Sequence, residues 1–219
     1  MIMINKRSKI TTISFDADGT LVTSSFADLV WLEALPQHVS ESWGIPLVDA
    51  KNKLFADYES IGPRRMEWYD LSYWIKRYRL ELTPKSFIMQ YKDAVTPFPE
   101  VAEVLGALRE EYQLIVISNS ARLFLDVTTG GFKDCFKKTF STVSDFGTMK
   151  DANSYKIVCD KMGIMPYEMA HVGDSFELDY VRARKAGIRA FFLDRQSRSR
   201  RRGRSFVTDL KDFKSRLKR

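Results

Sequence analysis

Two aspartates stand one residue apart in the stretch FDADGTL, residues 15–21. The stretch continues the apolar, β-branched run of residues 10–15, so Asp16 and Asp18 lie where a buried strand should end. Like charges this close together cost stability unless a cation or hydrogen-bond donors offset them. The pair is therefore either an acidic turn, in which Asp and Gly are ordinary residues, or half of a site that holds a cation.

Other polar residues stand at the ends of later apolar runs. Ser118 ends the run of residues 113–118 and Asn119 follows it. Asp174 follows the run of residues 169–173, and Asp179 stands five residues further on. Lys150 precedes a helical pattern. Each residue alone has a common structural explanation, because Ser and Asn cap helices, Gly-Asp forms turns and a single Lys is usually solvated. In an open α/β sheet, however, ligands bind outside the carboxyl ends of the strands, so their joint placement indicates one site.

The elements that must position these residues alternate between strand and helix. Pro before a helical pattern and Gly after it mark the boundaries. Strand alternating with helix predicts a doubly wound, Rossmann-like parallel α/β sheet. The predicted strands are residues 10–15, 113–118, 139–142, 169–173 and 188–193, and the predicted helices are residues 100–111, 121–128, 154–162 and 176–186.

The stretch after the first strand breaks this alternation. It contains no good strand and several helical patterns, which are interrupted at Pro36, Pro46, Pro63 and Pro84. We expect an all-helical cap domain over residues 25–95, inserted into an α/β catalytic core of residues 1–24 and 96–219.

The length of 219 residues and the hydrophobic content of 44% suffice for a full core. No apolar run could span a bilayer and the start lacks a secretory h-region, so we expect a cytoplasmic protein without a membrane partner. The cysteines Cys135 and Cys159 lie too far from the two histidines, in any ligand-like spacing, to suggest a zinc site or a disulfide framework.

The formal net charge of +7 comes from the end of the chain. Residues 195–219 carry +9, so the remainder sums to −2. Residues 206–210 predict a last short strand and a capped helix. The loop from Arg195 to Arg204 would steer anionic substrates, bind nucleic-acid phosphates without reading sequence, or simply be a solvated charge run.

The set of polar residues suits phosphoryl transfer. An aspartate carboxylate attacks phosphorus as a nucleophile, and the transferred group needs in-line positioning and cations. Three carboxylates without His or Cys ligands suit a hard ion, Mg²⁺. A small phosphorylated metabolite is the expected partner of such a site.

Four motifs in order resemble those of the haloacid dehalogenase-like superfamily, in its helical-cap branch of phosphoglycolate phosphatase-like and β-phosphoglucomutase-like proteins. They are FDADGTL, ISNS, SDFGTMK, and GDSFELD followed by RKAG. The resemblance covers residues 10–194 in the core, whereas the cap matches in position and helical character alone. It implies a Mg²⁺-dependent hydrolase that forms an aspartyl-phosphate.

The first motif implies roles for three residues. Asp16 would be the nucleophile and a ligand of Mg²⁺. Asp18 would protonate the leaving oxygen and then activate water, which is general acid–base work, while its backbone carbonyl completes the metal site. Thr20 would stiffen the loop.

The later motifs imply the rest of the site. Ser118 and the backbone of Asn119 would hold phosphate oxygens near a helix N-terminus. Lys150 would neutralise charge on the phosphate and on the nucleophile. Asp174 would bind Mg²⁺, with Asp179 hydrogen-bonding behind it.

The sequence departs from the family pattern at two positions. The third motif often has Lys-Pro, whereas Lys150 precedes Asp151, which leaves Lys156 as a rival; the 24-residue separation from Asp174 favours Lys150. Leu178 replaces a commonly polar residue of the fourth motif, so this position offers no polar side chain for an outer contact to the metal.

The cap stretch GPRRMEWYDLSYWIKRYR mixes aromatic and basic residues. Aromatics at helical spacing usually form a core, and we expect most of these to do so. Arg64 and Arg65 are the better candidates for a substrate-binding lid.

The resemblance leaves several functions open. The dehalogenase branch lacks the second aspartate, so Asp18 favours a phosphatase acting on a small phosphate monoester. A sugar phosphomutase would use the same core. From a different class, the chain would be a nucleic-acid-associated protein acting through its Arg-rich tail. We expect a monomer or a homodimer.

Overall fold

The computed structural model describes residues 9–197 and 203–217. In these ranges six parallel strands form one sheet in the order β3-β2-β1-β4-β5-β6. β1 and β4 are wholly buried, and β2 is buried except at its first residue, as the continuous apolar runs predict for a sheet covered on both faces. The strands are β1 Thr12–Phe15, β2 Gln113–Ser118, β3 Lys138–Ser141, β4 Met169–Gly173, β5 Arg189–Leu193 and β6 Phe206–Val207.

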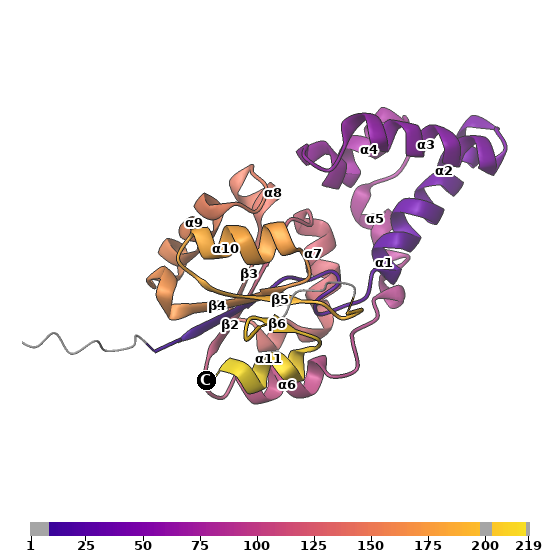
Figure 1. Ribbon diagram of the computed structural model, residues 1–219. Helices are drawn as coiled ribbons and strands as arrows, with labels where there is room; N and C mark the ends of the chain where they lie inside the picture. The colour runs from indigo at the N-terminus through magenta and orange to yellow at the C-terminus, as the bar shows by residue number, and fades with distance from the viewer. Residues whose placement is uncertain (1–8, 198–202, 218–219) are drawn as a thin grey trace, which may run out of the picture.

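Helices cover the two faces of this sheet (Figure 1). One apolar cluster joins α6 and α11 to the strands, and another joins α9, η6 and α10 to the opposite face. Asp151 caps α9 in a capping box, and Gly163 ends it in the left-handed conformation. The helices of the core are α6 Val101–Leu108, α7 Arg122–Thr129, η4 Gly130–Cys135, α8 Thr142–Phe146, α9 Ala152–Met162, η5 Pro166–Glu168, η6 Phe176–Val181, α10 Arg182–Lys185 and α11 Leu210–Leu217.

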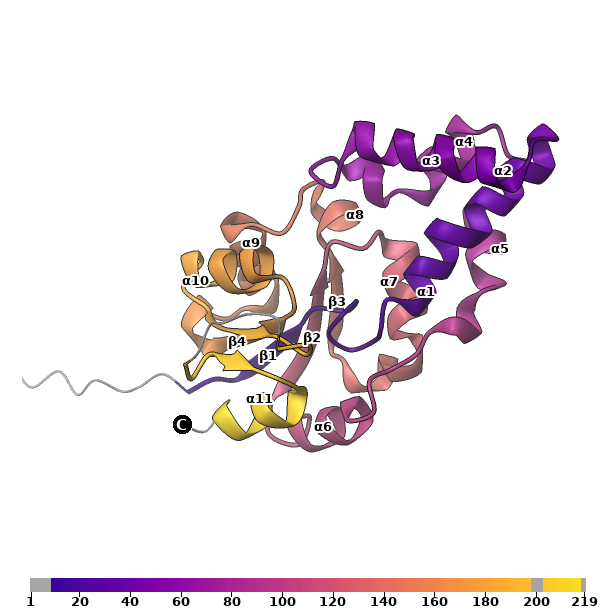
Figure 2. The ribbon, with the colours of Figure 1, turned by 45° about the vertical axis from the view of Figure 1, so that its right-hand side comes forward.

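The stretch between β1 and α6 is helical and stands beside the sheet (Figure 2). It has its own apolar cluster, in which Leu54, Trp74 and Phe87 are fully buried. The two segments that join it to the sheet lie side by side, because the Thr23 amide donates to the Thr96 carbonyl at 2.9 Å. Its helices are α1 Ser25–Asp28, η1 Leu29–Ala34, α2 Leu35–Trp43, α3 Leu47–Ile61, η2 Met66–Tyr69, α4 Leu71–Arg77, α5 Pro84–Met89 and η3 Lys92–Ala94.

The predicted fold class, a doubly wound parallel α/β sheet, is confirmed. The helix expected over residues 176–186 is divided, because η6 is π-helical and α10 continues it as an α-helix. The division of the chain into a cap of residues 25–95 and a core stays a prediction. In the described ranges no helix is both long and apolar enough to cross a membrane.

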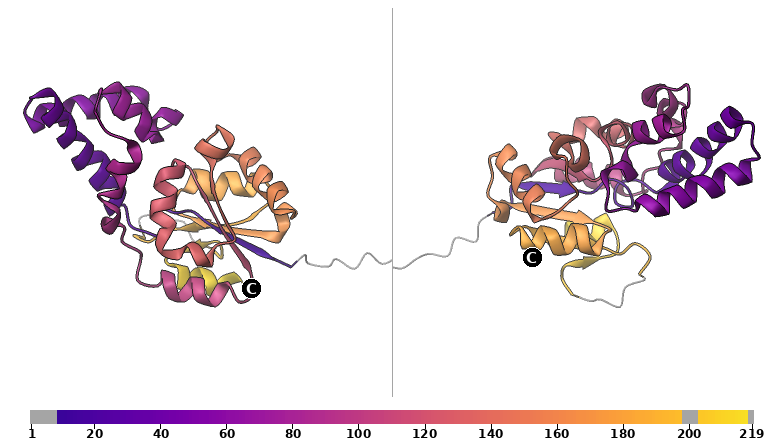
Figure 3. Two further views of the ribbon diagram at one scale, coloured as in Figure 1. Left: turned by 180° about the vertical axis from the view of Figure 1, so that it is seen from behind. Right: turned by 90° about the horizontal axis from the view of Figure 1, so that it is seen from above.

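The strand order brings the candidate site residues together. β1 pairs with β2 on one side and with β4 on the other. The chain builds β2 and β3 on one side of β1 before it crosses to β4, so the topological switch lies at β1. The carboxyl ends of these three central strands therefore share one edge, on the side of the helical stretch (Figure 3).

Candidate active site

Lys150 joins two aspartates at this edge of the sheet. Its Nζ lies 2.8 Å from Asp16 Oδ1 and 2.5 Å from Asp179 Oδ1, and all three side chains are buried. Burial and the nearby acids Asp179 and Asp174 raise the pKa of Asp16 to about 8, although Lys150 opposes this. Burial would likewise raise the pKa of Asp179, but Lys150 and then His171 hold it well below its usual value. Lys156 is exposed on α9, away from this cluster.

Three carboxylates gather where a cation would lie. One oxygen from each of Asp16, Asp174 and Asp179 lies within 4.8 Å of the other two. The Asp174 carboxylate rests on the backbone of Gly19, where a Cβ would meet Asp174 Oδ2 at 2.2 Å, so a residue with a side chain at position 19 would displace it. Asp174 is exposed at the surface, but desolvation of its carboxylate by the surrounding residues, and then Asp179, raises its pKa to about 6.

This donor set fits a hard divalent ion such as Mg²⁺, which prefers carboxylate oxygens. Asp16 and Asp174 are the better placed to bind it directly. Both oxygens of Asp179 already have protein donors, since Oδ1 faces Lys150 and His171 and Oδ2 accepts the Ser175 amide at 2.9 Å. Asp179 therefore suits the supporting position behind the ion.

Asp18 is held by the second motif. Its Oδ2 accepts a hydrogen bond from Ser120 Oγ at 2.6 Å. Burial raises the pKa of Asp18, and the bond from Ser120 only partly offsets this effect. A raised pKa favours the protonated carboxyl that a proton donor needs.

Asn119 connects the second motif to the third. Its Oδ1 accepts from the Lys150 amide and from Thr142 Oγ1, each at 2.7 Å, so the side chain helps to fix Lys150. Its Nδ2 is buried and has no hydrogen-bond partner among the described residues. The buried Ser118 hydroxyl accepts from the Ser120 amide at 3.1 Å. Asn119 lies close enough to the Tyr69 hydroxyl to interact with it, so an acceptor in the site would compete with Tyr69 for this amide.

A buried polar network behind Asp179 was absent from the sequence analysis. His171 Nδ1 lies 2.7 Å from Ser14 Oγ, and its Nε2 lies 3.0 Å from the Tyr155 hydroxyl and 3.2 Å from Asp179 Oδ1. Burial lowers the pKa of His171, which favours the neutral ring. Only the apolar strand context of His171 hinted at this role in the sequence.

Arg195 supports the first motif from behind. Its guanidinium donates to the carbonyl oxygens of Thr20 at 2.6 Å and Gly19 at 3.2 Å, and it pairs with Glu100 at 2.7 Å. The Thr20 hydroxyl is buried without a partner among the described residues, so the contact runs through its backbone. Arg195 was expected in the basic loop, whose residues 198–202 lie outside the described ranges.

A cavity of about 560 Å³ lies beside Asp18, between the helical stretch and α7. Trp68 and Tyr69 line it, whereas Trp74 is buried in the apolar cluster of the helical stretch. Arg64 and Arg65 are exposed and do not line the cavity, and Arg65 pairs with Glu67. The structure therefore brings aromatic side chains of this stretch, rather than its arginines, to the site.

A doubly wound α/β sheet with acids and a lysine at its carboxyl edge is typical of an α/β enzyme. Residues 10–187 match the family of haloacid dehalogenase-like hydrolases. A phosphoglycolate phosphatase from Chromobacterium violaceum is 30% identical over 201 residues, which are 83% of each chain. The chain therefore belongs to the haloacid dehalogenase-like hydrolases, and it is an enzyme.

Solved structures agree on the fold. A haloacid dehalogenase-like phosphatase from Thermococcus onnurineus superposes with a TM-score of 0.83 at 21% identity, over 94% of this chain and 97% of that one. A 2-haloacid dehalogenase from Pseudomonas syringae gives a TM-score of 0.67 at 22% identity, over 95% and 98% of the chains. Because both activities occur on this fold, the reaction must be argued from the site.

Proposed function

We propose that the enzyme is a Mg²⁺-dependent phosphatase that hydrolyses a small phosphate monoester through an aspartyl-phosphate on Asp16. The observation that carries the proposal is the pairing of Asp16 with a buried Lys150 beside a second, separately held aspartate, Asp18. The phosphatase from Chromobacterium violaceum supports the same reaction class.

In the first step, a carboxylate oxygen of Asp16 attacks phosphorus and the bond to the leaving oxygen breaks. Asp18 gives its proton to that oxygen, and its raised pKa favours this step. Lys150 opposes the rise in the pKa of Asp16, which favours the nucleophilic carboxylate, and it attracts the phosphoryl group, to which Asn119 Nδ2 can donate a hydrogen bond.

In the second step, Asp18 removes a proton from water, whose oxygen attacks phosphorus. Inorganic phosphate leaves and the carboxylate of Asp16 is restored. Mg²⁺, held by Asp16, the Asp18 carbonyl and Asp174 with Asp179 behind them, would neutralise the charge of the transferred group.

Two other functions have less support. A sugar phosphomutase needs polar groups to hold a second hydroxyl, and nine of the thirteen residues that line the cavity beside Asp18 are alanine, leucine or aromatic. For a nucleic-acid role of the Arg-rich tail, the guanidinium of Arg195 is not free to bind phosphate, because it is bonded to the first motif. We therefore put forward neither.

Hydrolysis of a generic aryl phosphate tests the proposal. We expect phosphate release with Mg²⁺, none in excess chelator, and a loss of at least about 10³-fold in Asp16→Asn. Asp126→Asn on the exposed face of α7 is the matched control and should keep full activity. Equal activity of Asp16→Asn and the control would contradict the mechanism.

A further inference from the structure

The cavity beside Asp18 is continuous with the candidate catalytic residues. Asp18 and Ser120 lie in its wall, and its volume of about 560 Å³ is in the range of small-molecule sites. The leaving oxygen of a substrate attacked by Asp16 has to face Asp18. The organic group attached to that oxygen therefore extends into this cavity.

Six of the thirteen residues in the wall are aromatic. Trp31 stacks on Phe124 with ring centroids 5.1 Å apart and planes at 4°. Tyr58 meets Trp31 edge-on at 6.2 Å, and Trp68 packs against Tyr58 at 5.9 Å. Rigid aromatic surfaces of this kind favour apolar, and above all aromatic, ligand groups.

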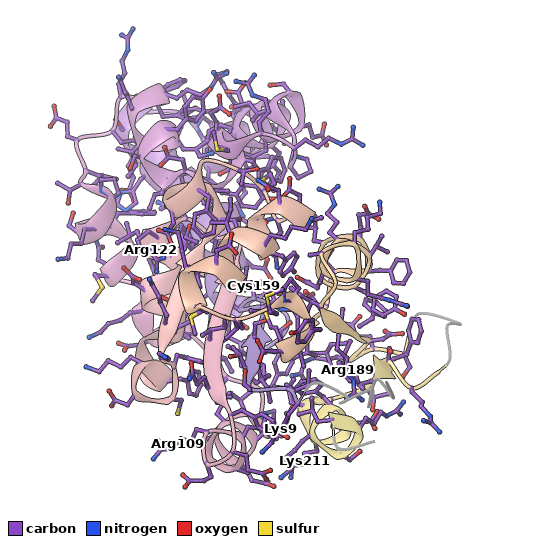
Figure 4. All side chains as sticks on the ribbon, turned by 90° about the vertical axis from the view of Figure 1, so that its left-hand side faces the viewer. Lys9, Arg109, Arg122, Cys159, Arg189 and Lys211 are labelled. Carbon is purple, nitrogen blue, oxygen red and sulfur yellow. The ribbon has the colours of Figure 1, made fainter. Side chains whose placement is uncertain are left out.

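Besides Asp18, the wall holds two carboxyl groups that would repel an anion. Asp28 and Glu59 join Asp18 there, and Asp28 lies near enough to Asp18 to contribute to its raised pKa. Among the described residues, no Lys, Arg or His lines the cavity. The basic residues Lys9, Arg109, Arg189 and Lys211 lie toward the end of the molecule away from the helical stretch (Figure 4).

A carboxylate on the leaving group would lie beside Asp28 and Glu59 in this cavity, and no Lys, Arg or His among the described residues of its wall could pair with it. Its binding would therefore be unfavourable, while an uncharged apolar group gains from burial. Phosphoglycolate, for which the relative from Chromobacterium violaceum is named, carries such a carboxylate and would therefore bind poorly here.

We propose that the substrate is a phosphate monoester whose organic group is apolar, of about the size of one aromatic ring, and free of negative charge. The proposal rests on the proposed phosphatase function and assigns its substrate class. Trp31, Tyr58 and Phe124 hold the ring, and Asp28 and Glu59 exclude anionic esters.

Three esters test the proposal on the full chain with Mg²⁺: phenethyl phosphate, its para-carboxylate derivative and phosphoglycolate. We expect kcat/KM for phenethyl phosphate to exceed the other two by at least about tenfold, the size of one unfavourable charge contact. Equal or faster hydrolysis of either carboxylate ester would overturn the proposal. If none of the three, nor a generic aryl phosphate, is hydrolysed, the proposed function itself fails.

A charge introduced into the wall gives the second test. Leu32 lines the cavity and is 40% exposed, so Leu32→Arg should fold. It should raise kcat/KM for the para-carboxylate ester relative to phenethyl phosphate by about tenfold. Leu47→Arg, 37% exposed on α3 and outside the cavity, is the matched control and should leave the ratio unchanged. The same ratio in both variants would place the organic group elsewhere and overturn the proposal.

Discussion

Lys150 Nζ lies 2.8 Å from Asp16 Oδ1, and both side chains are buried. Lys150→Met should lower phosphatase activity on the order of 10²–10³-fold, because the cation no longer offsets charge on the nucleophile and the phosphate. It should also cost about 3 kcal/mol of unfolding free energy by leaving Asp179 buried without its main partner. Steady-state kinetics and urea unfolding measure the two effects.

Lys156→Met is the control for this variant, since Lys156 is exposed on the next helix. It should keep both activity and stability. If Lys156→Met loses as much activity as Lys150→Met, the assignment of the catalytic cation to Lys150 is wrong.

Asp18→Asn should lower kcat by about 10²–10⁴-fold for esters with a poor leaving group, because the leaving oxygen receives no proton. The first step needs no acid when the leaving group is a nitrophenolate, so a burst of phenolate should precede slow turnover. Stopped-flow absorbance on a series of aryl phosphates measures this. A loss of the same size for every ester, without a burst, would exclude the role of proton donor.

Much of this site followed from the sequence because strand ends are marked by short signals. The runs at residues 113–118 and 169–173 matched β2 and β4 to the residue, since continuous apolar runs flanked by polar turns leave little ambiguity. The strand order then brings the motif residues Asp16, Lys150 and Asp179 to the same edge of the sheet.

Side-chain direction was beyond the sequence. Tyr69 reaches the cavity while Trp74 enters the core, although both lie in one aromatic stretch, because Tyr69 ends the 3₁₀ helix η2 and Trp74 lies on the separate helix α4. Likewise, the pattern around Arg195 indicated an exposed basic loop. Its pairing with Glu100 and Thr20 joins residues about a hundred or more positions apart, which no local pattern encodes.

The stability of the metal-free protein should fall as pH rises from about 4 to about 8. The folded-state pKa of Asp16 is raised to about 8 and that of Asp174 to about 6. The folded state therefore binds more protons than the unfolded state in this window, and stability is lost as these groups ionise. Urea unfolding with chelator at several pH values measures the slope.

Asp16→Asn should flatten this slope, and Mg²⁺ should raise stability most near pH 8, where the ionised acids are uncompensated. The pKa of Asp57 is shifted in the opposite direction: hydrogen bonds from Tyr78 and Arg77 outweigh the effect of burial and lower it. Asp57→Asn should therefore be less stable than the wild type above pH 4, while its unfolding free energy should fall with pH as steeply as that of the wild type. An unchanged slope in Asp16→Asn would contradict the raised pKa.

Arg195→Met should lower kcat about tenfold with little change in KM, since Arg195 positions the carbonyls of Gly19 and Thr20 beneath the nucleophile without touching the substrate cavity. The midpoint of Mg²⁺ activation should rise as well, a shift that a loss of global stability alone would not produce. Arg109→Met is the control, because Arg109 is exposed and, among the described residues, pairs with its neighbour Glu110. Unaltered kcat and Mg²⁺ midpoint in Arg195→Met would remove this positioning role.

The central claim is that Asp16 carries the phosphoryl group during turnover. Rapid mixing of the Mg²⁺-loaded enzyme with substrate, followed by acid quench and borohydride, reduces an aspartyl-phosphate to homoserine, which peptide mass spectrometry locates. We predict homoserine at position 16 in the wild-type chain, at no other aspartate, and at none in the Asp16→Asn variant. Homoserine at another position, or none at all during active turnover, would contradict the account.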